Sequence, residues 1–396
     1  MLSNRINAIK PSPTLQVTAK AAELKRQGLP IISLSAGEPD FPTPDHIKAA
    51  AIEAIHQNKT RYTDVQGIPE LREAICAKLK RDHDLDYSID AISVSSGAKQ
   101  AIFNLMGVLL NPGDEVLIPA PYWVSYPDMA LLFDAKPVII ESHAENRLKI
   151  TPAALEAALT PRSKLLILNS PSNPSGVAYS KAELKALGAV LLKHPQVVIC
   201  SDDIYEKVMW AGEFANIVMA EPALKDRTIV INGLSKAYAM TGWRMGYAAG
   251  DLKLIKAMNK LQSQSTSNAC SISQYASIAA LNGDQNCLHP MVAAFKSRHD
   301  YLFKEINRIP GMNMLAADGA FYAFVNVQDL IKQNGFTDDI AFSNMLLEKA
   351  YLAGVPGSAF GAPGYIRFSY ATSMAELEIA VARLQKTFLP SLGARL

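Results

Sequence analysis

Short apolar runs alternate along the middle of the chain with segments whose apolar residues recur every three to four positions. The short runs, rich in valine, isoleucine and leucine, predict buried strands, and the longer segments predict helices that pack one face against a core. Strands are predicted at residues 91–95, 115–119, 135–141, 164–169, 197–201 and 228–232, and helices at 45–57, 68–81, 100–110, 126–133, 152–159 and 181–193. This alternation indicates an α/β fold with a mainly parallel sheet.

The pattern changes after Gly283. A long helical segment at 291–306 is followed by short strands interrupted by glycine and proline, and then by a last helix at 374–388. The first 45 residues are too short to form a domain of their own. We therefore expect a large domain at 46–290 and a smaller α+β domain made of 12–45 together with 291–396, with a cleft between the two.

Composition narrows the class of protein. The 396 residues are 49% hydrophobic, enough for two cores, and 39 basic residues nearly balance 37 acidic ones. No segment clusters basic and aromatic residues, so we expect small-molecule partners and no nucleic acid. The four cysteines are scattered, which predicts reduced core residues and no metal site. No signal peptide or membrane-length apolar run is recognisable, so we expect a cytoplasmic protein with no membrane contact.

The segment 235–247 carries the most informative chemistry. Lys236 stands eight positions before Arg244, directly behind the apolar run 228–232 and the turn residue Gly233. A lysine at the end of a buried strand can face a cleft, where its amine can condense with a carbonyl, and a guanidinium nearby can grip a phosphate with two hydrogen bonds. Taken alone, the pair is more typical of an exposed or ion-paired lysine, since lysines mostly lie at the surface.

A possible phosphate site lies where the predicted strand at 91–95 turns into a helix. The free N–H groups of Gly97, Ala98 and Lys99 would point outward at the positive end of the helix dipole, where an anion is stabilised. Every strand–turn–helix connection has a helix N-terminus with free N–H groups, so this segment indicates a phosphate site only together with Arg244.

Polar residues follow two other predicted strands. Asp202 could supply the carboxylate that a pyridine ring needs at its nitrogen to serve as an electron sink, and Tyr205 could present a phenol to the same space. Asp202 could equally be a helix N-cap. Asn173 lies in a loop rich in serine and proline, which is typical of an ordinary turn, and Trp123 could stack on a flat ring or fill core space.

Together, these segments and the late strand 365–369 resemble the fold type I, pyridoxal-phosphate-dependent class I aminotransferases, and most closely the bacterial aspartate/prephenate subgroup. The resemblance extends over nearly the whole chain, and its most specific part is the segment 235–247. It implies a large domain with a seven-stranded, mainly parallel sheet flanked by helices, and a smaller α+β domain.

The resemblance also implies a role for each residue around the cofactor, pyridoxal 5′-phosphate. Lys236 would be the catalytic residue that carries the cofactor and moves the substrate proton. Asp202 would pair with the ring nitrogen, Tyr205 and Asn173 would bind the ring oxygen, and Trp123 would stack on the ring. The phosphate region would be held by Gly97, Ala98, Lys99 and Arg244.

On the substrate side, Arg367 would clamp the α-carboxylate, and Gly37 would let the backbone approach the amino acid; Trp123 and Asn173 would also contact the substrate. The chain departs from the best-known aspartate aminotransferases because it has no arginine between Arg244 and Arg298. The resembled subgroup suggests that the distal carboxylate is bound by Lys99, Ser12 and Thr14. A second departure is Gly233, where many relatives carry a phosphate-binding serine.

Tyr62 matches a family residue that reaches the phosphate of the neighbouring subunit. This implies a homodimer with shared active sites, and residues 1–11 would then be an interlocking arm.

The resulting prediction is an aspartate aminotransferase that converts L-aspartate and 2-oxoglutarate to oxaloacetate and L-glutamate. An aminotransferase for prephenate, or a broader one for aromatic or alanine donors, stays open. A non-catalytic cofactor-binding domain would need a DNA-binding extension, which the sequence does not show. A Rossmann dehydrogenase would need G-x-G-x-x-G after its first strand, which is absent.

Overall fold

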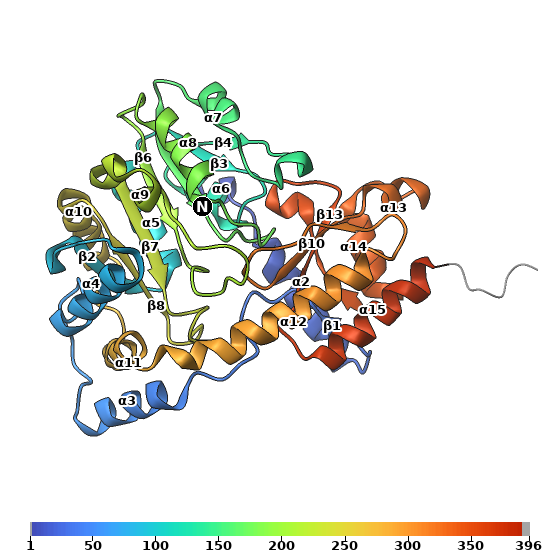
Figure 1. Cartoon of the computed structure of the whole chain (residues 1–396), viewed down its shortest axis with the longest axis horizontal. Helices are drawn as coiled ribbons and strands as arrows, with labels where there is room; N and C mark the ends of the chain where they lie inside the picture. The colour runs from blue at the N-terminus through green and yellow to red at the C-terminus, as the bar shows by residue number, and fades with distance from the viewer. Residues whose placement is uncertain (1, 390–396) are drawn as a thin grey trace, which may run out of the picture.

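A seven-stranded sheet forms the centre of the computed structural model, which describes residues 2–389 (Figure 1). The strand order is β2-β8-β7-β6-β5-β3-β4, and neighbours are parallel except that β8 runs antiparallel to both β2 and β7. The strands are β2 (Ile92–Ser96), β3 (Glu115–Pro119), β4 (Lys136–Ile140), β5 (Ser163–Asn169), β6 (Val198–Asp202), β7 (Thr228–Gly233) and β8 (Met245–Ala249). The predicted α/β fold with a mainly parallel sheet is confirmed.

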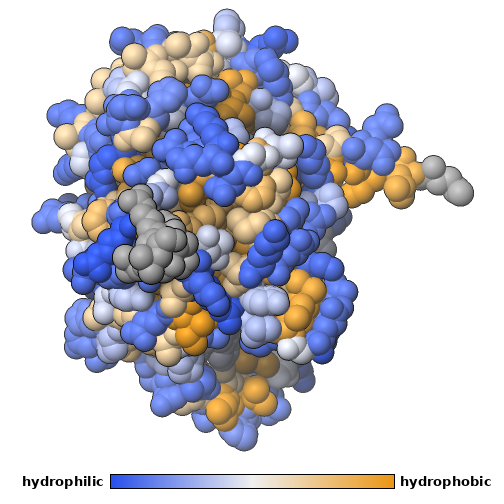
Figure 2. Space-filling model, turned by 90° about the vertical axis from the view of Figure 1, so that its right-hand side faces the viewer, coloured by the Kyte–Doolittle hydropathy of each residue, from blue (hydrophilic) through white to orange (hydrophobic). Residues whose placement is uncertain are grey.

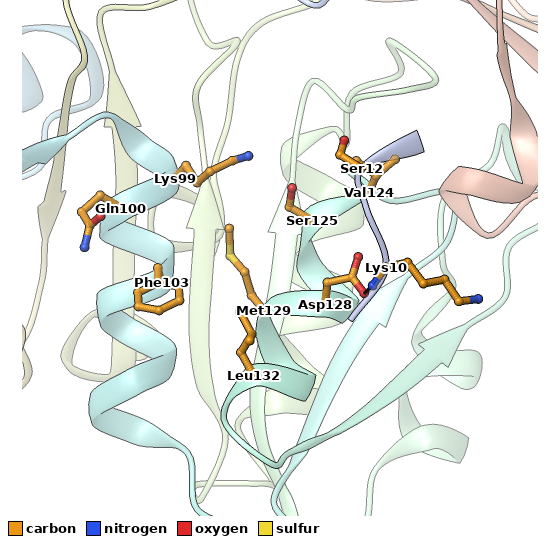
Figure 3. A pocket seen from close by; sticks show the side chains of 10 residues that line it. All are labelled: Lys10, Ser12, Lys99, Gln100, Phe103, Val124, Ser125, Asp128, Met129 and Leu132. Carbon is orange, nitrogen blue, oxygen red and sulfur yellow. Dashed lines mark hydrogen bonds between the residues drawn. The ribbon is translucent and has the colours of Figure 1, made fainter. Parts of the chain in front are cut away.

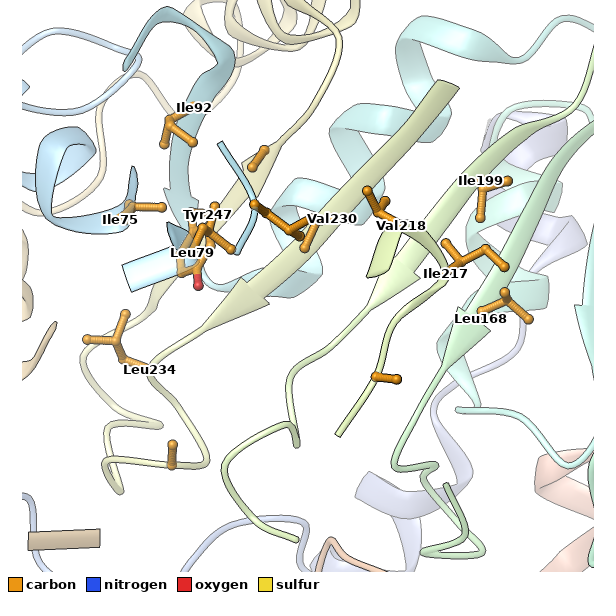
Figure 4. Packing of buried hydrophobic residues seen from close by; sticks show 14 of the residues in the cluster. Ile75, Leu79, Ile92, Leu168, Ile199, Ile217, Val218, Val230, Leu234 and Tyr247 are labelled. Carbon is orange, nitrogen blue, oxygen red and sulfur yellow. The ribbon is translucent and has the colours of Figure 1, made fainter. Parts of the chain in front are cut away.

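Successive residues of each central strand enter two different cores, because side chains alternate between the faces of a sheet. In β7, Ile229 and Ile231 pack with one set of helices, and Val230 packs with the other (Figure 4). The first set is α5 (Ala98–Leu109), α6 (Ser125–Leu132) and α10 (Leu252–Ser263). The second core includes residues of α3 (Asp45–His56), α4 (Pro69–His83), α7 (Pro152–Ala158), α8 (Lys181–Leu191), α9 (Ile217–Ala220) and α11 (Ser271–Asn282).

A second, antiparallel sheet of four strands belongs to the C-terminal part, with order β12-β13-β10-β9. Its strands are β9 (Asn313–Met314), β10 (Tyr322–Asn326), β12 (Val355–Pro356) and β13 (Tyr365–Ser369). Figure 1 shows α12 extending from the neighbourhood of α11 to α15. The helices here are α12 (His289–Ile306), α13 (Gln328–Gln333), α14 (Asp339–Lys349) and α15 (Met374–Phe388).

The N-terminal segment contributes α1 (Asn4–Ala8), α2 (Pro13–Arg26) and β1 (Ile32–Ser33), and β1 pairs in parallel with β11 (Leu352–Ala353). Figure 2 shows the start of this segment projecting from a surface on which polar and apolar residues are interspersed. The predicted domain boundaries stay a prediction, and residues 1 and 390–396 of that prediction lie outside the described residues.

Seven helices and one strand were not predicted from the sequence: α1, α2, α9, α10, α11, α13, α14 and β8. Strand β8 was not predicted because its sequence, Met-Gly-Tyr-Ala-Ala, lacks the β-branched residues that favour strands. Its place in the sheet is set by hydrogen bonding to β2 and β7. The prediction that all four cysteines are core residues was wrong for Cys270, which is exposed just before α11. Among residues 2–389, no helix has the length and apolar character that a membrane crossing requires.

Candidate active site

The carboxyl ends of β5, β6 and β7 open into a cavity of about 470 Å³. Ends of parallel strands meet at one edge of a sheet, which is where α/β proteins bind ligands. Of the fourteen residues predicted to bind cofactor or substrate, all but Gly97 and Tyr62 line this cavity. They are Ser12, Thr14, Gly37, Ala98, Lys99, Trp123, Asn173, Asp202, Tyr205, Lys236, Arg244 and Arg367.

Lys236 follows the end of β7 and reaches across to the N-terminal segment. Its Nζ donates a hydrogen bond to the backbone oxygen of Gly37. Burial lowers the pKa of Lys236 to about 8, although the negative charge of Glu38 opposes that shift. Near neutrality a sizeable fraction of the amine is therefore unprotonated, as a nucleophile or base must be.

Asp202 is the last residue of β6 and is almost completely buried, with 4% of its surface exposed. Its Oδ2 accepts a hydrogen bond from the Tyr126 hydroxyl at 2.5 Å. Burial raises the pKa of Asp202 to about 6 in spite of this donor. The alternative role as a helix N-cap is excluded, because turns and no helix follow at 204–207. A buried carboxylate with one strong donor has room for a second, cationic partner.

The predicted phosphate turn joins β2 to α5, and Gly97 there has a φ of +86°, which favours glycine. A side chain at Gly97 would collide with the guanidinium of Arg244, and one at Gly246 would collide with the backbone of Ala98. Two glycines therefore let Arg244 and the first amides of α5 lie together. Gly97 itself does not line the cavity but lies directly behind Arg244.

The glycine at position 233 is explained by packing. A Cβ there would lie 2.7 Å from the backbone oxygen of Met245, so a serine fits only if β8 moves. The serine that lines the cavity next to Lys236 in sequence is Ser235.

Arg367 projects from β13 and is only 1% exposed. Its Nη1 donates to Asn173 Oδ1 at 2.9 Å and its Nη2 donates to the Ser35 backbone oxygen at 2.7 Å. Its Nε has no hydrogen-bond partner within residues 2–389. A buried guanidinium without a carboxylate and with an unused N–H is suited to an anionic ligand.

The far side of the cavity is built by Lys99, Trp123 and the segment before α2. Lys99 Nζ lies 4.8 Å from the centre of the Trp123 ring, and burial together with the nearby Arg244 lowers the pKa of Lys99. Figure 3 shows Lys99 and Ser12 on opposite sides of an adjoining pocket of about 340 Å³. Positive charge and hydroxyls thus line the same end of the site.

Tyr62 lies apart from these residues, with 93% of its surface exposed. Residues of the site that sequence reasoning missed include Glu38, Tyr126, Ser235 and Tyr322, which line the cavity, and Gly246, which packs against the phosphate turn. Only Tyr126 had a signal in the sequence, because it stands three positions after Trp123 and a turn there brings the two rings together, with centres 5.3 Å apart.

The donor set fits pyridoxal phosphate. Arg244 and the start of α5 suit its phosphate, the buried Asp202 carboxylate suits a protonated ring nitrogen, and the Lys236 amine suits its carbonyl. Among the described residues, no three His, Cys, Asp or Glu side chains are grouped to hold a metal ion.

Comparisons with known proteins agree with this geometry. The profile of the family "Aminotransferase class I and II" matches residues 30–384. The chain is 55% identical to the aspartate/prephenate aminotransferase of Nitrosomonas europaea over 97% of this chain and 98% of that protein. It is 48% identical to the aspartate aminotransferase of Rhizobium meliloti strain 1021, over 96% and 95% of the two chains.

Two solved structures are similarly close. The aspartate aminotransferase from Rhizobium meliloti superposes with a TM-score of 0.93 at 47% identity, over 97% of this chain and 98% of that one. The aspartate aminotransferase from Thermus thermophilus with maleate also superposes with a TM-score of 0.93, at 40% identity, over 98% and 99% of the two chains.

Proposed function

Because this chain belongs to the class I and II aminotransferase family, we propose that it transfers the amino group of L-aspartate to 2-oxoglutarate with pyridoxal 5′-phosphate as cofactor. The products are oxaloacetate and L-glutamate. The observation that carries the proposal is the convergence on one cavity of a lysine with a pKa of about 8, a buried carboxylate and a buried arginine with an unused N–H.

When bound, pyridoxal phosphate supplies a carbonyl that takes up the amino group and a protonated ring that accepts the electron pair of the broken Cα–H bond. Lys236 Nζ is the base that removes the Cα proton, and its lowered pKa suits proton transfer near pH 7. Asp202 keeps the ring nitrogen protonated, since a buried carboxylate strongly favours a cationic partner. Tyr205 and Asn173 bind the ring oxygen.

Arg244, the amides of Ala98 and Lys99, and the Ser235 hydroxyl hold the phosphate. Arg367 binds the α-carboxylate of the substrate through its guanidinium, whose Nε has no partner among residues 2–389. This pairing holds the amino acid with its Cα near Lys236.

The distal carboxylate of aspartate is bound by Lys99, with Ser12 and Thr14 beside it. The similarity to an aspartate aminotransferase solved with maleate supports a site for four-carbon dicarboxylates. A lysine ammonium is a point charge and cannot bind a carboxylate with two parallel hydrogen bonds as a guanidinium does. We therefore expect this end of the site to discriminate between acids less sharply than a site built on arginine.

An absorbance spectrum of the purified protein, recorded before and after addition of L-aspartate, tests the proposal. We expect the band of the lysine-linked cofactor to disappear with aspartate and to return with 2-oxoglutarate. The variant Lys236→Ala should bind the cofactor without that band and without turnover. Normal turnover by this variant, or a spectrum that aspartate leaves unchanged, would contradict the proposal.

A second candidate differs only in the acceptor. The 55% identical relative is an aspartate/prephenate aminotransferase, and the Lys99 end of the site adjoins the flat ring of Trp123. We therefore also propose prephenate as an acceptor. Aspartate-loaded enzyme should be offered 2-oxoglutarate, prephenate and phenylpyruvate in parallel. A kcat/KM for prephenate comparable to that for 2-oxoglutarate would favour the second candidate.

The active form is proposed to be a homodimer whose partner subunit supplies Tyr62 to the phosphate. This proposal rests on the exposure of Tyr62 and on the resemblance. Lys236→Ala should be inactive and Tyr62→Ala only weakly active, but mixed dimers contain one site with both native residues. Recovered activity on mixing supports shared sites, and no recovery despite subunit exchange contradicts them. A cytoplasmic location likewise stays a prediction.

A further inference from the structure

Tyr322 lies at the start of β10, is 0% exposed at its surface, and lines the cavity. Its hydroxyl lies 2.8 Å from the hydroxyl of Tyr205. The guanidinium of Arg367 lies over its ring, 4.5 Å from the ring centre. One side chain thus contacts both the phenol proposed to bind the cofactor and the arginine proposed to bind the substrate.

The hydroxyl contact has a definite direction once the cofactor is bound. A tyrosine has one O–H and can donate only one such hydrogen bond. If Tyr205 donates to the ring oxygen, it has no proton left for Tyr322. Tyr322 must then donate to Tyr205, and a phenol that accepts a hydrogen bond is a stronger donor in turn.

The turn at Gly37 is shaped around the same hydroxyl. A Cβ on Gly37 would lie 2.9 Å from the Tyr322 oxygen, and the backbone oxygen of Gly37 accepts the hydrogen bond from Lys236. The ring contact is separate from the hydroxyl. A guanidinium above an aromatic face is attracted to it most strongly where water is excluded, so the ring restricts where Arg367 can lie.

We propose that Tyr322 is a positioning residue of this site, whose hydroxyl orients the Tyr205 phenol and whose ring supports Arg367. The inference rests on the proposed function and deepens it, because it assigns the alignment of cofactor and substrate to one side chain. The two roles are separable: Tyr322→Phe removes the hydroxyl and keeps the ring, and Tyr322→Leu removes both.

The first test is the pH titration of the absorbance of the bound cofactor in Tyr322→Phe. The hydrogen bond that Tyr205 donates to the ring oxygen disfavours protonation of the lysine-linked nitrogen. Tyr322→Phe weakens this hydrogen bond and should therefore raise the midpoint of the titration by roughly 0.3 pH unit. The matched control is Tyr370→Phe, because Tyr370 is also 0% exposed and its hydroxyl has no hydrogen-bond partner among residues 2–389. This control should leave the midpoint unchanged.

The second test is the KM for L-aspartate. Tyr322→Phe should keep the wild-type KM, whereas Tyr322→Leu should raise it about tenfold, since the cation–π support of Arg367 is lost. Thermal unfolding of each variant shows whether it is folded.

The outcomes separate this inference from the function on which it rests. If the wild-type protein shows no cofactor band that aspartate alters, the proposed function fails. If the wild type behaves as proposed but Tyr322→Phe titrates with an unchanged or lowered midpoint, the hydroxyl role is overturned. If Tyr322→Phe and Tyr322→Leu have the same KM, the ring role is overturned.

Discussion

The Lys236 amine is expected to lose its proton at about pH 8 in the cofactor-free protein. Burial is the main cause, because it removes water from the charged form. The charges of Arg244 and Arg367 lower the pKa further, whereas Glu38 and Asp202 raise it. The perturbation that tests this account is Glu38→Gln, which removes the largest opposing contribution and should move the midpoint below 8.

The fraction of neutral Lys236 follows from the shift of its pKa from 10.5 to about 8. At pH 7, roughly 9% of an amine with a pKa of 8 is neutral, against roughly 0.03% of one at 10.5. The neutral, nucleophilic form is therefore enriched about 300-fold over an ordinary lysine.

The same shift affects stability. Between pH 8 and 10.5 the unfolded chain binds more protons at this position than the folded protein, so stability rises with pH across that window. Below pH 8 the charged lysine opposes folding by at most about 3 kcal/mol. The cofactor-free variant Lys236→Met should accordingly be more stable than wild type at pH 7, and the difference should narrow towards pH 10.5.

The assay is competitive acetylation of the cofactor-free protein at a series of pH values, with the extent at each lysine read by mass spectrometry. The exposed Lys193 serves as the internal reference. The solvent accessibility of a lysine changes how much of it is acetylated but not the pH at which acetylation is half-maximal. A midpoint for Lys236 near 10.5, or one that Glu38→Gln raises, would refute the reasoning.

Three further outcomes are expected. Lys99→Ala should raise KM for aspartate at least tenfold but leave KM for alanine nearly unchanged, because only aspartate has a distal carboxylate; equal effects in steady-state kinetics would count against this role. Gly246→Ala should weaken cofactor binding at least tenfold by equilibrium dialysis, since its methyl group pushes the phosphate turn away from Arg244. Tyr126→Phe should raise the pKa of Asp202 in the cofactor-free protein above about 6, because the carboxylate loses its shortest donor; an unchanged midpoint of the carboxyl signal in an NMR titration would count against this.

Local sequence patterns predicted some strands accurately and missed other elements. Strands β3 and β7 were predicted with nearly the bounds they have, because continuous β-branched and aliphatic runs between turns have few alternatives. Strand β8 and helix α2 were not predicted. Glycine and alanine make up most of β8, and α2 has only one buried residue, so neither has a clear periodicity. Contacts with other elements stabilise both.

The sequence by itself determined the fold class and the family, and it predicted that Lys236, Asp202 and Arg244 belong to one site, where they line the same cavity. These are local signals: a polar residue just past a buried strand is already placed at the ligand-binding edge of a parallel sheet. The tertiary structure alone decided which side chains surround them. Tyr322 and Tyr205 are 117 residues apart, one in β10 and the other in the turns that follow β6, so no spacing could reveal that their hydroxyls meet.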